Sequence, residues 1–163
     1  MKRTLLLMGA AIACAISAKT QDFSGTWVRH SKQYVTGPQY VNAAAKQMTV
    51  ALKADSIVVT TVSPGENGQD FSFSQAISMN GKPSIIIGKT SKRKFSTTLA
   101  LSPDKKILTL TTACSTPDNE NEVDFTRIET WTLSADGKQL YMDKKSVETK
   151  SETWEVKAVF VKQ

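Results

Sequence analysis

The chain has 163 residues, of which 40% are hydrophobic and 22% are charged, and its formal net charge is +6 at pH 7. A chain of this length can bury about two-thirds of its unfolded surface, which is enough for one domain with its own core. The positive charge is too small to indicate a nucleic-acid-binding face. No apolar run after residue 18 is long enough to cross a bilayer.

The first 18 residues have the layout of a secretory signal peptide. Lys2 and Arg3 form a basic start, an apolar run follows, and Ser17 and Ala18 supply the small residues of a cleavage site. We expect cleavage after Ala18 and a secreted or periplasmic mature protein. Removal of the leader lowers the formal charge from +6 to +4, because it takes away two cations and no acidic residue.

A cysteine near the end of the apolar run offers an alternative. In bacterial lipoproteins such a cysteine is lipidated after cleavage just before it. Cys14 follows a suitable Ala13, but Ala11 stands where leucine is usual. A lipoprotein anchored through Cys14 is therefore the alternative to release. In both cases the mature domain, residues 19–163, keeps only Cys114, so no internal disulfide is expected and stability must come from a core.

Alternation of apolar and polar residues dominates this domain and predicts strands with one buried face. Residues 70–79 show it most clearly, with Phe71, Phe73, Gln75 and Ile77 on one face and three serines and Ala76 opposite. Ten strands are predicted, at residues 24–30, 47–53, 56–63, 70–79, 84–89, 94–101, 106–114, 123–133, 139–147 and 153–161.

The breaks between these segments are short and rich in turn-forming residues. They include "PGENG" at 64–68, "MNGK" at 79–82, "SPDKK" at 102–106 and "SADGK" at 134–138. Strands joined in sequence by tight turns form an antiparallel meander, and closure into a barrel removes its exposed edges. We therefore predict an all-β fold: a single antiparallel up-and-down β-barrel of 8–10 strands, with at most one short helix, at residues 38–47, after the first strand.

Phe23, Gly25 and Trp27 in "FSGTW", the alanine-rich segment after the first strand and the hairpin "ETWTLSADGK" resemble the lipocalin and fatty-acid-binding (calycin) superfamily. The resemblance is strongest to small exported bacterial lipocalin-like proteins. The chain lacks the Thr-Asp-Tyr motif of many lipocalins, and its ten strands favour the fatty-acid-binding layout. The resemblance implies that Trp27 plugs the closed end of the barrel, with Gly25 beside it and a cation across the indole. Lys162 and Arg127 are the candidates for that cation.

The stretch "VDFTRIETWTL" at 123–133 holds the main candidates for a binding site. If its apolar ends define the inner face, Arg127 and Glu129 point inward together, which is costly unless they are paired or meet a polar ligand. In fatty-acid-binding barrels an interior arginine commonly receives a carboxylate, which implies this role for Arg127. The alternative is a bulge or a pair at the rim, because a slip of one residue sends both side chains outside. The predicted ligand-binding residues are Arg127, Glu129, Gln75, Phe73, Phe95 and Trp131.

The sequence predicts no catalytic residue, metal site or cofactor, and so no enzyme. His30 is the only histidine, and the alternation in the first strand predicts that it faces outward, opposite to Trp27. Cys114 lies among apolar neighbours, as an inert packing thiol does. The acidic loop at 116–124 lacks the glycine turn of calcium loops.

We therefore expect an exported, monomeric, lipocalin-like binding protein that holds a small hydrophobic or amphipathic molecule inside its barrel. The alternative is a filled barrel that acts through its surface, as an envelope component or inhibitor. Its working parts would then be the basic tip at 89–94 and the acidic loop at 116–124.

Overall fold

The computed structural model describes residues 22–65 and 67–163; the predicted leader, with Cys14, lies outside them. The ten predicted strands are confirmed, and the first is longer than expected because it continues to Thr36. Their bounds are β1 Gly25–Thr36, β2 Gln47–Leu52, β3 Ser56–Pro64, β4 Asp70–Ser78, β5 Ser84–Ile87, β6 Lys94–Leu101, β7 Ile107–Ser115, β8 Val123–Leu133, β9 Gln139–Glu148 and β10 Trp154–Lys162.

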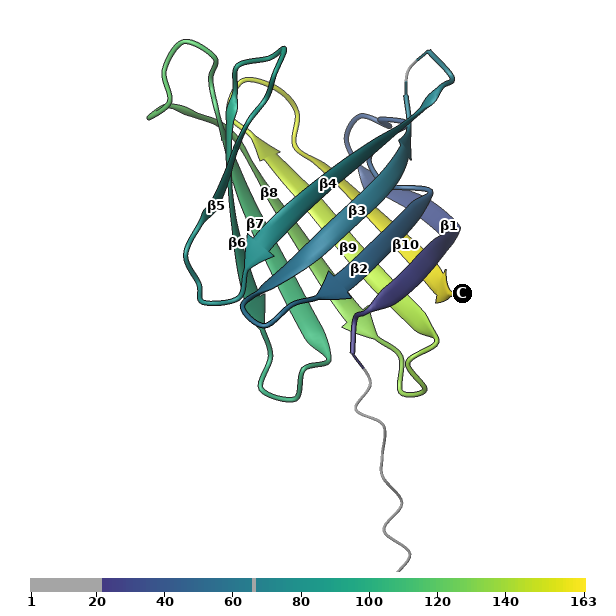
Figure 1. Cartoon of the computed structure of the whole chain (residues 1–163). Helices are drawn as coiled ribbons and strands as arrows, with labels where there is room; N and C mark the ends of the chain where they lie inside the picture. Colours follow the sequence, from purple (N-terminus) through teal and green to yellow (C-terminus); the bar gives the residue numbers. More distant parts are fainter. Residues whose placement is uncertain (1–21, 66) are drawn as a thin grey trace, which may run out of the picture.

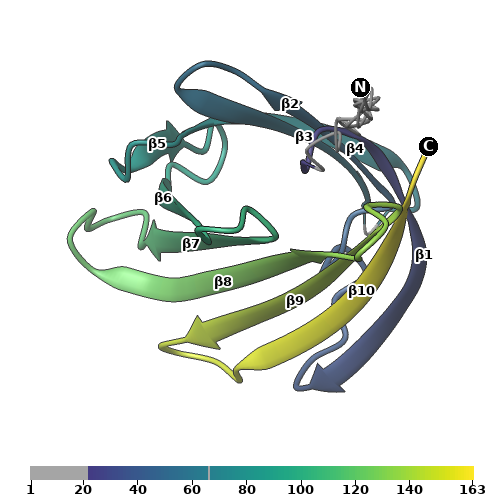
Figure 2. The same ribbon diagram turned by 90° about the horizontal axis from the view of Figure 1, so that it is seen from below.

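The strands form one antiparallel sheet that curls into a nearly closed barrel (Figures 1 and 2). Every strand except β4 pairs with its successor in the sequence, and β1 also pairs with β10. The two ends of the sheet are β4 and β5, which approach each other without a hydrogen-bonded ladder between them. The predicted antiparallel, up-and-down, all-β barrel is therefore confirmed.

The helical turns predicted over residues 38–47 do not form. Residues 37–46 form a loop of turns, bends and irregular backbone, and the part of the chain that the structure describes contains no helix. Three alanines, Ala43, Ala44 and Ala45, are instead buried in the core. A helix this short has little stability of its own, so packing of the loop against the barrel decides its conformation. No described segment is a helix long and apolar enough to span a membrane.

The lower end of the barrel in Figure 1, where the chain enters β1, is packed solid around Trp27. The Trp27 side chain is fully buried, and its Nε1 donates a hydrogen bond of 2.8 Å to the carbonyl oxygen of Phe23. Lys162 Nζ lies 5.1 Å from the centroid of the indole. Of the two cations considered from the sequence, Lys162 therefore covers Trp27, and Arg127 lies elsewhere.

Gly25 sits directly beneath Lys162, and its replacement by alanine should destabilise the fold. Its φ is +121°, and an added Cβ would lie 2.7 Å from Lys162 Cε. We expect Gly25→Ala to lower the free energy of unfolding by about 1–3 kcal/mol, measured by urea denaturation. Gly81→Ala is the matched control, because Gly81 also has a positive φ, +79°, but open space around it. An equal or smaller loss at Gly25 would contradict the backbone strain and close approach assigned to this position.

Candidate functional site

A cavity of about 600 Å³ occupies the other half of the barrel. Its volume is within the usual range for small-molecule sites, about 300–1,000 Å³. Along β4 the inward-facing residues become more exposed toward the β3–β4 hairpin: Ile77 is 2% exposed, whereas Phe73 is 46% and Phe71 is 47% exposed. All three line the cavity. The cavity therefore opens where the unpaired edge of β4 meets that end of the barrel.

The structure places all six predicted ligand-binding residues in the lining of this cavity. They come from opposite walls: Gln75 and Phe73 from β4, Phe95 from β6, and the others from β8. Gly25 and Trp27 do not line the cavity, and lie in the packed end beyond it. Trp131 separates the two regions, since it lines the cavity and also contacts Phe23, with ring centroids 6.4 Å apart. Ligand binding by these residues stays a prediction.

The register of β8 explains why its charged residues face inward. Pairing with β7 is regular from Phe125 to Thr132, and the irregularity lies before it, between Cys114 and Ser115 of β7. A bulge at Arg127 does not occur. On β9, Arg127 faces Ser146 and Glu129 faces Lys144, so that two adjacent strands present polar side chains to one wall.

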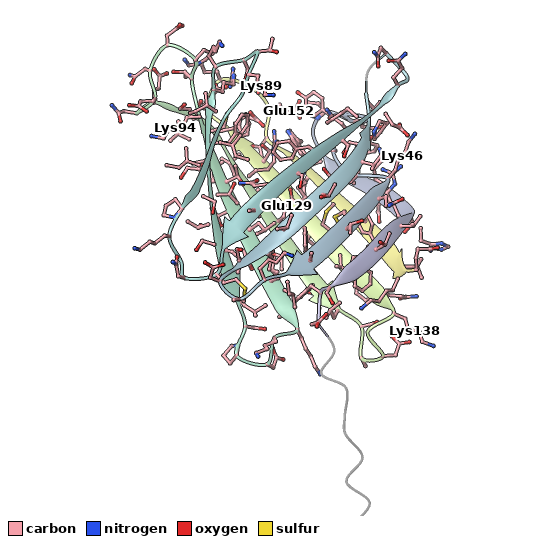
Figure 3. The ribbon with its side chains drawn as sticks, in the orientation of Figure 1. Lys46, Lys89, Lys94, Glu129, Lys138 and Glu152 are labelled. Atoms are coloured by element: carbon pink, nitrogen blue, oxygen red, sulfur yellow. The ribbon has the colours of Figure 1, made fainter. Side chains whose placement is uncertain are left out.

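Glu129 and Lys144 form an ion pair inside the cavity. Lys144 Nζ lies 2.8 Å from Glu129 Oε1, with the side chains 15% and 22% exposed respectively. Trp131 Nε1 donates to Glu129 Oε2 at 3.4 Å. Burial favours the neutral carboxyl, but the Lys144 ammonium, the Arg127 guanidinium and the hydrogen bond from Trp131 together outweigh it and lower the pKa of Glu129 below its ordinary value. Glu129 lies within the barrel in Figure 3, whereas Lys89, Lys94 and Glu152 lie at its rim.

Arg127 is held by aromatic faces rather than by a carboxylate. Its guanidinium carbon lies 4.3 Å from the ring centroid of Phe125 and 5.4 Å from that of Trp154. Its Nε donates a long hydrogen bond of 3.5 Å to Ser146 Oγ. Burial lowers the pKa of Arg127 and nearby carboxylates oppose this, so the group stays protonated at neutral pH. Among the described residues, Arg127 forms no ion pair and its terminal nitrogens donate no hydrogen bond.

Two further polar side chains in the cavity lining, Glu148 and Gln75, have atoms without a hydrogen-bond partner among the described residues. Glu148 accepts hydrogen bonds through Oε1 only, from Ser146 Oγ at 2.6 Å and from Trp154 Nε1 at 3.1 Å. Within residues 22–65 and 67–163, its Oε2 has no hydrogen-bond partner and it forms no ion pair. Gln75 Nε2 is buried and likewise without a partner in the described structure. A buried donor in that state costs free energy until something accepts its hydrogen bond.

The sequence-based prediction missed the polar residues that β9 contributes, Lys144, Ser146 and Glu148. A signal was present, because they continue the parity of Leu140 and Met142, both buried. The inward face of β9 is therefore apolar in the first half of the strand and polar in the second half. Tyr40 was missed as well; it lines the cavity from the β1–β2 loop.

The other residues considered for chemistry lie away from the cavity lining. His30 is exposed and sits at an irregularity in the pairing of β1 with β10. Cys114 is fully buried, and burial raises the pKa of its thiol, which disfavours the reactive thiolate. Across the part of the chain that is described, no group of three or more His, Cys, Asp or Glu side chains is arranged to hold a metal ion.

No protein-family model and no curated protein matches this chain. Among solved structures, a match is the crystal structure of zebrafish ileal bile acid-binding protein complexed with cholic acid. The sequences are 15% identical, the TM-score is 0.48, and the match covers 86% of this chain and 98% of that one. At this distance the comparison assigns no ligand to the present chain.

Proposed function

We propose that this protein is a binding protein that holds a small amphipathic molecule in the barrel cavity, with the polar end of the ligand at Arg127. The supporting observation is the combination of an open cavity of about 600 Å³ with a partly buried guanidinium that pairs with no carboxylate of the described residues. Aromatic and aliphatic side chains cover much of the remaining wall, which suits an apolar body.

A filled barrel that acts only through its surface has less support, because the interior is not filled. The large inward residues Phe73 and Phe95 leave the space open instead of packing across it. Interiors are normally packed without voids of this size, so a large open cavity is typical of a site that receives a ligand.

Titration with 1-anilinonaphthalene-8-sulfonate, an apolar anion that fluoresces when it leaves water, tests the proposal. Thr61→Trp should fill part of the cavity and weaken the binding of this probe at least tenfold, because Thr61 lines the cavity from β3. Thr60→Trp, the neighbouring position on the opposite face, is the matched control and should bind as the wild type does. Equal binding by the two variants, or no binding by the wild type, would contradict the proposal.

A further inference from the structure

The charges in the cavity lining cancel. Four charged residues line it: the cations Arg127 and Lys144 and the anions Glu129 and Glu148. A ligand with a single anionic group would therefore leave one excess negative charge beside side chains that are only partly exposed to water, and a single ammonium would leave one excess positive charge there. Either excess is costly where water is scarce.

These four residues are not equivalent. Lys144 and Glu129 satisfy each other directly at 2.8 Å. Arg127 and Glu148 both contact the hydroxyl group of Ser146, at 3.5 and 2.6 Å, so Arg127 Nε and Glu148 Oε1 lie no more than about 6 Å apart. They form no ion pair. Opposite charges at this separation are near enough to share one small ligand group.

Both groups are fixed in position by Trp154. The indole ring lies beneath the guanidinium of Arg127, and its Nε1 donates to Glu148 Oε1 at 3.1 Å. Phe125 holds the guanidinium from another side, at 4.3 Å. The terminal nitrogens of Arg127 and Oε2 of Glu148 are the atoms that have no hydrogen-bond partner among the described residues. Arg127 and Glu148 are therefore held apart from each other. The terminal nitrogens of Arg127 can donate hydrogen bonds to a ligand, and Oε2 of Glu148 can accept one from it.

We propose that the ligand has a zwitterionic head, with a carboxylate that binds Arg127 and an ammonium that binds Glu148, as in an α-amino acid with a long apolar side chain. This inference rests on the proposed function and narrows its ligand class. A zwitterion leaves the cavity neutral, and it meets both unused groups at once, which neither a simple acid nor a simple amine does.

Four ligands with the same twelve-carbon chain test this inference: 2-aminododecanoic acid, dodecanoic acid, dodecylamine and dodecan-1-ol. Each displaces 1-anilinonaphthalene-8-sulfonate from the wild-type protein at pH 7. We expect 2-aminododecanoic acid to bind at least tenfold more tightly than dodecanoic acid and dodecylamine. If dodecanoic acid or dodecylamine binds as tightly, the zwitterionic head is excluded and the proposed function stands. If none of the four binds, the proposed function fails and the inference fails with it.

Glu148→Gln provides a second measurement. It should remove most of the advantage of 2-aminododecanoic acid over dodecanoic acid without weakening the binding of dodecanoic acid. Glu122→Gln, an exposed loop position paired with Lys150, is the matched control and should keep the wild-type order. An unchanged order in Glu148→Gln would overturn the role of Glu148. If Glu148→Gln does not fold, the order measured on the wild-type protein decides.

Discussion

Arg127→Met is expected to weaken the binding of dodecanoic acid by about 10- to 100-fold. A hydrogen bond to a charged group contributes about 1.5–3 kcal/mol, and each 1.4 kcal/mol is a factor of ten in affinity. Methionine keeps an apolar chain against Phe125 and Trp154, so the change removes the charge and its donors rather than the packing. Displacement of 1-anilinonaphthalene-8-sulfonate by dodecanoic acid gives the affinity.

Two controls separate loss of the anchor from loss of the fold. Lys138→Met removes an exposed cation at the opposite end of the barrel and should leave the affinity unchanged (Figure 3). Dodecan-1-ol, which has no charge to pair, should lose less affinity in Arg127→Met than dodecanoic acid does. Unchanged binding of dodecanoic acid in Arg127→Met would remove Arg127 from the site.

Lys144→Met is expected to lower the free energy of unfolding by about 3–5 kcal/mol at pH 7, measured by urea denaturation. The variant leaves the carboxylate of Glu129 in the cavity wall without its partner, and the cost of that unpaired charge exceeds the worth of the pair. The double variant Lys144→Met/Glu129→Gln should recover much of the loss, because it removes the orphaned charge as well. A double variant less stable than Lys144→Met would contradict this account.

The ion pair between Glu129 and Lys144 should also make the stability of the fold depend on pH. The pKa of Glu129 is lowered in the folded protein, so the carboxylate contributes stability above its unfolded pKa, and this is lost as the pH falls through the folded pKa. The loss should therefore begin below about pH 4.5, the ordinary value. In Lys144→Met, only Arg127 and the hydrogen bond from Trp131 still oppose burial, so the pKa of Glu129 should be higher than in the wild type, and the destabilisation should shrink as the carboxyl is protonated. Parallel stability curves for the wild type and Lys144→Met between pH 4 and pH 7 would contradict the assignment.

The fold could be predicted from the sequence because a strand with one buried face shows a direct alternation of apolar and polar residues. The alternation in "VDFTRIETWTL" allowed an inward position for Arg127 and Glu129 but left a bulge or a pair at the rim as the alternative; the regular pairing of β8 places both on the inner face. The resemblance of "FSGTW" to calycins suggested that a cation would cover Trp27. Its position in phase on the last strand made Lys162 a candidate for that cation.

The polar half of β9 gives a weaker signal, because only the alternation begun by the buried Leu140 and Met142 indicates it. In "DKKSVE" both parities carry charged residues, so the pattern does not distinguish Lys144 and Glu148, which line the cavity, from Lys145, which does not. Their inward position follows from the register with β8, which is a tertiary property. The alanines at 43–45 show the same limit. Their helix propensity is real, but burial of the loop against the barrel outweighs it.

The missing ladder between β4 and β5 has a kinetic consequence. No hydrogen-bonded ladder joins these strands; Ser78 N donates to Ser84 Oγ at 2.9 Å where the connection between them begins and ends, and a molecule that passes between the strands has no sheet pairing to break. The groups that must move are side chains such as Phe71 and Phe73, which are already about half exposed. Rotation of exposed side chains takes picoseconds to nanoseconds, far less than the time needed to open a sheet. For the ligand we propose, exchange through this seam should therefore be limited by diffusion and by the strength of binding, not by motion of the barrel.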